Sequence, residues 1–153
     1  MIAVTLIGML TLGITACNKK TEITLDTTQF ANKIAQQGAF SDDLSPPEEG
    51  MFEELFSDVD TKNIVSKVAY VGTAASAEQI VVIEAKDEAS ASDIKEGLKE
   101  KLQYDIEQNR DYAPNEIPKL EKPVLEQLDK YVVMCVSNDN NKVEELIKEV
   151  KEQ

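Results

Sequence analysis

Short apolar runs rich in Val and Ile occur in two pairs from residue 64 onward. Within each pair the runs are separated by a short segment, residues 72–77 in the first pair and Asp129-Lys130 in the second. Strand-like runs joined by such short connections predict antiparallel hairpins. The four predicted strands are residues 64–71, 79–85, 124–128 and 131–137.

Apolar residues spaced three and four positions apart predict amphipathic helices around these strands. The clearest pattern is the last one, in which Val143, Leu146, Ile147 and Val150 share one helical face. Helix starts are marked by residues whose side chains cap free backbone amides, such as Asp26 and Asp87. The predicted helices are residues 26–38, a short one over 51–56, a long one from Asp87 to about Arg110, and the last one after Asn140.

The order of these elements is helix, helix, and then strand-strand-helix twice. This order predicts an α+β fold, with two layers and a four-stranded, mainly antiparallel sheet whose ββαββα core follows one or two N-terminal helices. Both faces of residues 131–136 are apolar, so we expect this strand and residues 79–85 in the middle of the sheet. We expect the long and C-terminal helices on one face and the first helix on the other. Residues 111–123, broken by Pro114, Pro118 and Pro123, are expected to form a loop or one loose turn.

The beginning of the chain has a different character, because residues 2–14 are apolar and carry no charge. This run is short for a bilayer span and suits the apolar region of a signal peptide. It ends in Ile14-Thr15-Ala16-Cys17, the pattern of a lipobox: small residues precede the cut and a cysteine thiol accepts a diacylglyceryl group. We therefore predict a signal peptide at residues 1–16, a lipidated tether at 17–25 and a single α+β domain at 26–153. The alternatives are an uncleaved N-terminal anchor or a buried first helix.

The net charge, the lack of His and the small number of cysteines limit the ligands and reactions that the protein can support. The net charge is −13, and residues 1–16 carry none of it, so the mature part is strongly anionic. Such a surface repels nucleic acid and anionic headgroups, and the expected membrane attachment is the lipid on Cys17 alone. The chain has no His and only two cysteines. Without His, the commonest general base and most zinc sites are excluded. With Cys17 lipidated, Cys135 would remain a free thiol, buried as a small hydrophobe in its apolar strand.

Three motifs carry a resemblance to a known family. They are Ser76-Ala77-Glu78-Gln79-Ile80-Val81-Val82, Asp111-Tyr112-Ala113-Pro114-Asn115-Glu116 and Lys130-Tyr131-Val132-Val133. From Phe30 to the C-terminus the chain resembles domain-of-unknown-function family 4358, small putative lipoproteins of clostridia and their relatives. The resemblance implies a lipobox leader and no particular activity.

Candidate site residues are few. Asp105 falls on the apolar face of the long helix, and Tyr112 and Glu116 follow it, so the three could line a cleft at the end of the sheet. The alternative is that the helix has left the core by Asp105 and that Tyr112 only packs its ring. The acidic pairs Asp42-Asp43 and Glu48-Glu49 lack the spacing of a calcium loop. We expect no metal and no cofactor.

These observations favour a non-catalytic binding or interaction module, held at the extracytoplasmic face of the bacterial cytoplasmic membrane by its diacylglyceryl cysteine. Its partner would be a protein or cell-wall component that the sequence leaves unidentified. One alternative is an accessory subunit or inhibitor of a cell-wall or transport machine. Another is a hydrolase that uses paired carboxylates.

Overall fold

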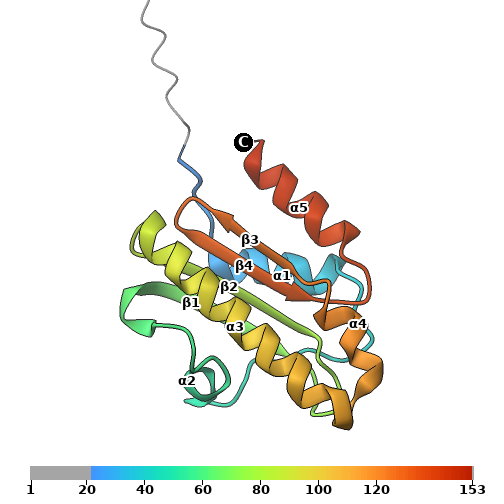
Figure 1. Cartoon of the computed structure of the whole chain (residues 1–153). Coiled ribbons are helices and arrows are strands. Elements are labelled where there is room, and N and C mark those ends of the chain that lie inside the picture. Colours follow the sequence, from blue (N-terminus) through green and yellow to red (C-terminus); the bar gives the residue numbers. More distant parts are fainter. Residues whose placement is uncertain (1–21, 153) are drawn as a thin grey trace, which may run out of the picture.

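The computed structural model describes residues 22–152 (Figure 1). The predicted signal peptide, the lipobox and Cys17 lie outside the described residues. No helix within 22–152 is long and apolar enough to cross a membrane. The elements in chain order are α1 (Thr27–Gln37), α2 (Met51–Leu55), η1 (Thr61–Asn63), β1 (Ile64–Val71), β2 (Gln79–Ala85), α3 (Glu88–Tyr112), η2 (Pro114–Glu116), α4 (Ile117–Leu120), β3 (Val124–Leu128), β4 (Tyr131–Val136) and α5 (Asn141–Lys151).

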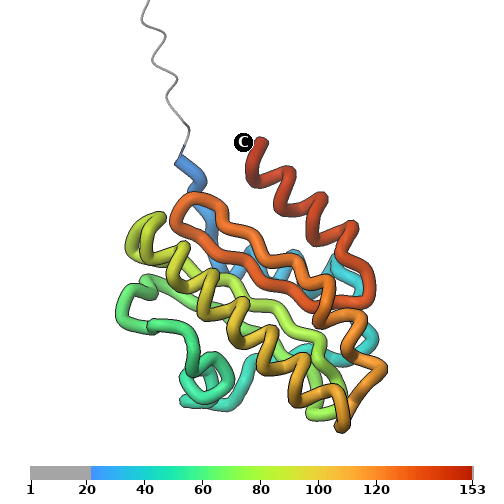
Figure 2. The backbone as a smooth tube through the Cα atoms, viewed as in Figure 1, coloured from blue at the N-terminus to red at the C-terminus, as the bar shows by residue number. Residues whose placement is uncertain are grey.

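The sheet is antiparallel throughout, with the strand order β1-β2-β4-β3. The two hairpins, green and orange in Figure 2, lie side by side because β2 pairs with β4. In that central pairing Val82 lies opposite Val133 and Val81 opposite Met134. The α+β class and the central positions of β2 and β4 are therefore confirmed.

Each central strand contributes to two separate apolar cores. On one face of β4, Val132, Met134 and Val136 pack beneath α3 and α2. On the other face, Tyr131, Val133 and Cys135 pack against residues of α1 and α5. All six residues are nearly inaccessible to solvent, as the alternation of apolar side chains on both faces predicted.

The placement of the C-terminal helix was predicted wrongly. Its apolar residues Val143, Leu146 and Ile147 join the core that contains Phe30 and Ile34 of α1, on the face opposite α3. The sheet therefore lies between two helical layers, and the two-layer description needs this correction. The face of β2 and β4 toward α1 is apolar from Ile80 to Val82 and from Tyr131 to Cys135, and α1 has only 11 residues. A second helix is needed to cover the area that α1 leaves exposed.

Capping side chains fix the helix starts as expected. The Asp26 carboxylate accepts a hydrogen bond from the Gln29 amide at 2.8 Å, and the Asp87 carboxylate accepts one from the Ser90 amide at 2.7 Å. Three short elements were not predicted as such. Residues 114–120, expected as a loop or loose turn, form η2 and α4, and η1 precedes β1. The two-residue turn between β3 and β4 is confirmed, with Asp129 in the left-handed conformation at φ 52°.

Gly97 lies in the interior of α3, where glycine normally destabilises a helix by about 1 kcal/mol relative to Ala. The structure supplies the reason for it. A Cβ at this position would stand 2.3 Å from the carbonyl oxygen of Asp58 and 3.2 Å from Cα of Val59. The segment after α2 thus crosses α3 in direct backbone contact, and Val59 enters the core beside it.

Gly97→Ala is expected to destabilise the domain by about 2–3 kcal/mol, in spite of its better helix propensity. The backbone of Asp58 cannot rotate away as a flexible side chain would, so α3 and the crossing segment must separate. Urea unfolding followed by circular dichroism measures the effect. Ser92→Ala, at an exposed position of the same helix, is the control and should change stability by less than about 0.5 kcal/mol. An equally small effect of Gly97→Ala would contradict the close crossing.

Candidate functional site

The three predicted site residues lie near one end of β2 and α3, and two of them are bonded to neighbouring segments. The Asp105 carboxylate is paired with Lys101 and accepts a hydrogen bond from the Gln79 amide group at 3.2 Å. The Glu116 carboxylate accepts one from the Ala77 backbone amide at 3.0 Å. Tyr112 is 73% exposed. Asp105 and Glu116 therefore hold the start of β2 through neighbouring residues, while Tyr112 faces solvent.

Glu78, which the sequence did not single out as a site residue, is the centre of this region. Its side chain is fully buried and accepts hydrogen bonds from the backbone amides of Ser41, at 2.8 Å, and Asp42, at 2.9 Å. The Lys119 ammonium group lies 2.9 Å from Glu78 and 3.0 Å from Glu116. A single lysine of α4 thus bridges two carboxylates that hold separate segments of the chain.

The charge state of this cluster follows from its surroundings. Burial of Lys119 opposes its charged form, but the hydrogen bonds that Lys119 donates to Glu78 and Glu116 outweigh burial and raise its pKa. The cluster thus places an ammonium group between two carboxylates. Among the described residues, no buried side-chain nitrogen or oxygen is left without a hydrogen-bond partner. Buried side chains with such hydrogen bonds to neighbouring segments are typical of a structural clamp.

The clamp secures the segment between α1 and α2. Residues 39–45 cross the end of the sheet, forming isolated bridges from Ala39 to Asp139 and from Ser45 to Val71. Beside the clamp, the Asp42 carboxylate accepts hydrogen bonds from the Thr73 hydroxyl at 2.7 Å and the Thr73 amide at 2.6 Å, and these lower its pKa. The region therefore ties together four parts of the chain: residues 39–45, the β1–β2 connection, residues 116–119 and the segment after β4.

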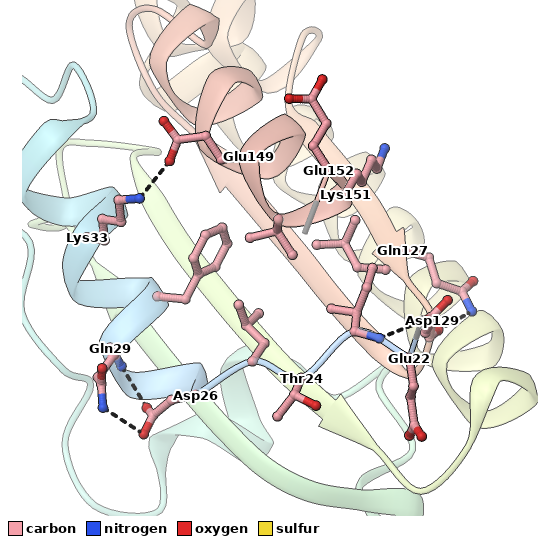
Figure 3. A pocket seen from close by; sticks show the side chains of 15 residues that line it. Glu22, Thr24, Asp26, Gln29, Lys33, Gln127, Asp129, Glu149, Lys151 and Glu152 are labelled. Atoms are coloured by element: carbon pink, nitrogen blue, oxygen red, sulfur yellow. Dashed lines mark hydrogen bonds and ion pairs between the residues drawn. The ribbon is translucent and has the colours of Figure 1, made fainter. Parts of the chain in front are cut away.

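A pocket lies at the opposite end of the domain, between α1, α5 and the β3–β4 turn (Figure 3). Its cavity volume is about 940 Å³, and the extended residues 22–26 form one of its walls. The backbone amide of Ile23 donates a hydrogen bond to the Asp129 carboxylate at 2.9 Å, which fixes this wall to the turn. Across the opening, Lys33 of α1 and Glu149 of α5 form an ion pair of 2.8 Å. A smaller pocket of about 380 Å³ lies between β3 and α5.

Residues 37–137 of the chain match a known family, described as Domain of unknown function (DUF4358). The chain belongs to this family. The predicted resemblance is thus confirmed. No curated protein sequence and no solved structure matches the chain.

The DUF4358 match runs from the last residue of α1 to the residue after β4, so it contains the whole sheet, α3 and the Glu78 clamp. Most residues that line the large pocket lie outside the match. Of its lining, only Gln127, Leu128 and Asp129 fall within the match, and the rest comes from the segments before and after it. The pocket therefore combines the β3–β4 turn with residues of α1, α5 and segment 22–26, which lie outside the match.

The described residues hold no cluster of three or more Asp, Glu, Cys or His side chains that could bind a metal ion. Cys135 is buried in β4 and free of any disulfide, as predicted. Burial raises the pKa of its thiol to about 12. The thiolate needed for nucleophilic or metal-binding chemistry is therefore strongly disfavoured at neutral pH.

In a chain carrying Cys17→Ser, Cys135 is the sole thiol. We expect a maleimide at pH 7 to label it about a hundredfold or more slowly in the native protein than in guanidinium chloride, because access requires local opening of the sheet. Mass spectrometry of timed samples gives both rates. Rapid labelling of the native protein would show that β4 opens easily and would restore a reactive role for the thiol.

Proposed function

We propose that this DUF4358 protein is a lipid-anchored, extracytoplasmic binding module that does not catalyse a reaction. The observation that carries the proposal is the uncharged apolar run 2–14 followed by Ile14-Thr15-Ala16-Cys17. Two acyl chains on Cys17 would anchor the protein stably, since each buried methylene contributes about 0.8 kcal/mol.

The position of the large pocket supports a binding role close to the membrane. Ile23 follows Cys17 by six residues, and an extended chain spans at most about 3.6 Å per residue, so the two lie within roughly 20 Å of each other. Ile23 itself lines the pocket. A lipid-anchored protein would then carry its pocket near the headgroups.

The electrostatics of the acidic groups support a non-catalytic role. A general acid of the hydrolase type needs a carboxyl group whose pKa is raised. The carboxyl groups with clear shifts in the described part, Asp42, Glu53, Asp87 and Glu149, all have lowered pKa values. Each one serves as an ionised hydrogen-bond acceptor, for Thr73, Lys67, Ser90 and Lys33 respectively.

A second candidate is an accessory subunit of a cell-wall or transport machine. It is favoured by Tyr104 and Tyr112 of α3, which are 56% and 73% exposed, because exposed aromatic residues are enriched in protein interfaces. Photocrosslinkers placed at these two positions in intact cells would capture one specific neighbour if α3 docks on a larger complex. A crosslinker at Glu48, an exposed residue shortly before α2, would serve as control.

Cys17→Ser tests the anchor directly. Cells fed with labelled palmitate should label the wild-type protein and leave the variant unlabelled and uncut, because the acyl-accepting thiol is gone. Gel mobility and fluorography measure both effects. Cys135→Ser is the matched control, since it removes the other thiol and should leave labelling unchanged. A Cys17→Ser protein that is still labelled and still cut before residue 17 would refute the lipid anchor.

A further inference from the structure

About half of the large pocket's surface is apolar. Five hydrophobic side chains line it, from the tether, α1, the end of β3 and α5: Ile23, Leu25, Phe30, Leu128 and Val150. Leu128 and Phe30 are almost fully buried, and the other three are half-buried against the same core. An apolar group of a ligand placed here would lose contact with water on several sides. At about 940 Å³, the cavity is also of the size that small-molecule sites have, about 300–1,000 Å³.

The charges around this surface are unequal. The lining includes five carboxylate residues, Glu22, Asp26, Asp129, Glu149 and Glu152, but only two lysines, Lys33 and Lys151. Figure 3 shows these side chains arranged about the opening. Lys33 is paired with Glu149 at 2.8 Å, Lys151 with Glu126 at 3.0 Å, and Lys148, beside the lining, with Glu152 at 3.7 Å. Among the lining residues the carboxylates exceed the lysines by three, and Lys148 offsets part of this negative excess.

The segment before α1, residues 22–26, forms part of the pocket wall. Residues 22–26 close the side of the cavity between α1 and the β3–β4 turn, and the hydrogen bond from Ile23 to Asp129 holds them there. Asp129 adopts a left-handed conformation in the turn, and this backbone arrangement presents its carboxylate to the tether. The segment that connects the domain to its N-terminus thus contributes apolar side chains to the site.

We propose that this pocket binds a small amphiphilic cation, with an aliphatic or aromatic body carrying an ammonium or guanidinium group. The apolar body would cover the half-buried side chains Ile23, Leu25 and Val150, and the cationic group would lie among the carboxylates of the opening. An anion of the same shape would meet those carboxylates and be repelled. This inference rests on the proposed binding role and does not depend on the lipid anchor.

Two ligands of similar shape and opposite charge test the proposal. The full chain, purified in phosphatidylcholine nanodiscs if it fractionates with membranes and in buffer if it does not, is titrated with 4-phenylbutylammonium and with 5-phenylpentanoate. Saturation-transfer NMR measures binding against empty nanodiscs or buffer. The cation should bind saturably with a Kd of about 1 mM or tighter, and the anion at least about tenfold more weakly. Equal binding of the two ligands, or no saturable binding of the cation, would overturn the proposal.

A charge-reversal pair locates the site. Glu22→Lys with Glu152→Lys changes two exposed residues of the opening and should weaken cation binding about tenfold or more. Glu100→Lys with Glu107→Lys makes the same change in net charge on exposed positions of α3, on the opposite face of the sheet, and should alter it less than about twofold. Equal losses in both variants would mean that only the overall charge attracts the cation.

A third variant separates the cavity from its charged opening. Val150→Trp places a large side chain at a half-buried position of the lining and should abolish saturable binding of the cation. Unchanged binding would show that the ligand lies outside the cavity. These results are independent of palmitate labelling: a labelled protein that fails to bind the cation loses this ligand assignment alone, and an unlabelled protein that binds it loses the anchor alone.

Discussion

Replacing Val133 with Asp is expected to destabilise the domain by about 4–5 kcal/mol, enough to remove much of the stability of a domain of this size. Val133 lies in a central strand, opposite Val82 of β2, and is fully buried. Phe30 and Ile34 of α1 and Leu146 of α5 share its core. A carboxylate there would find no cation and no hydrogen-bond donor among these neighbours, so it must either lose its charge or open the core.

Thermal melting followed by circular dichroism should show a decrease of about 15 °C or more for Val133→Asp. Val65→Asp is the matched control, because it makes the same change in an edge strand at a residue that is 63% exposed. It should lower the melting temperature by less than about 3 °C. A Val133→Asp protein that melts like the wild type would mean that α1 and α5 do not cover this face of the sheet.

Replacing Glu78 with Ala is expected to have the second largest effect, about 3–4 kcal/mol. The substitution removes a buried carboxylate and leaves the backbone amides of Ser41 and Asp42 without their acceptor. It also leaves the Lys119 ammonium with Glu116 as its remaining carboxylate. Unpaired buried donors and a half-compensated charge are each costly, because the interior offers them no water.

The loss should be greatest in the segment that Glu78 holds. Hydrogen exchange measured by mass spectrometry should show faster exchange at residues 39–45 in Glu78→Ala. Amides at the centre of β2 and β4 should exchange faster only by the amount that the lower global stability accounts for. Glu145→Ala is the control: it removes an exposed carboxylate paired with Lys142 and should change the melting temperature by less than about 2 °C. Unchanged exchange at residues 39–45 would refute the role of Glu78 as a clamp.

The sequence determined the parts of the fold that depend on neighbours along the chain. Alternation between Val132 and Val133 placed their side chains on opposite faces of one strand, and two apolar faces required a central position. Asp26 and Asp87 marked helix starts because a cap acts only on backbone amides two or three residues ahead. The DUF4358 motifs likewise lie within short segments and could be recognised without any structure.

Only the tertiary structure decided which surfaces meet. The stripe of Val143, Leu146 and Ile147 predicted an amphipathic helix, but periodicity carries no information about which face of the sheet the helix will cover. Gly97 gained its reason only from Asp58, about forty residues earlier in the chain. Glu78 has the sequence surroundings of a solvent-exposed charge, and its partners Ser41, Asp42 and Lys119 lie 36 to 41 residues away. The pocket likewise joins residues 22–33 to residues 127–152, because the packed domain has both ends of the described chain on one side.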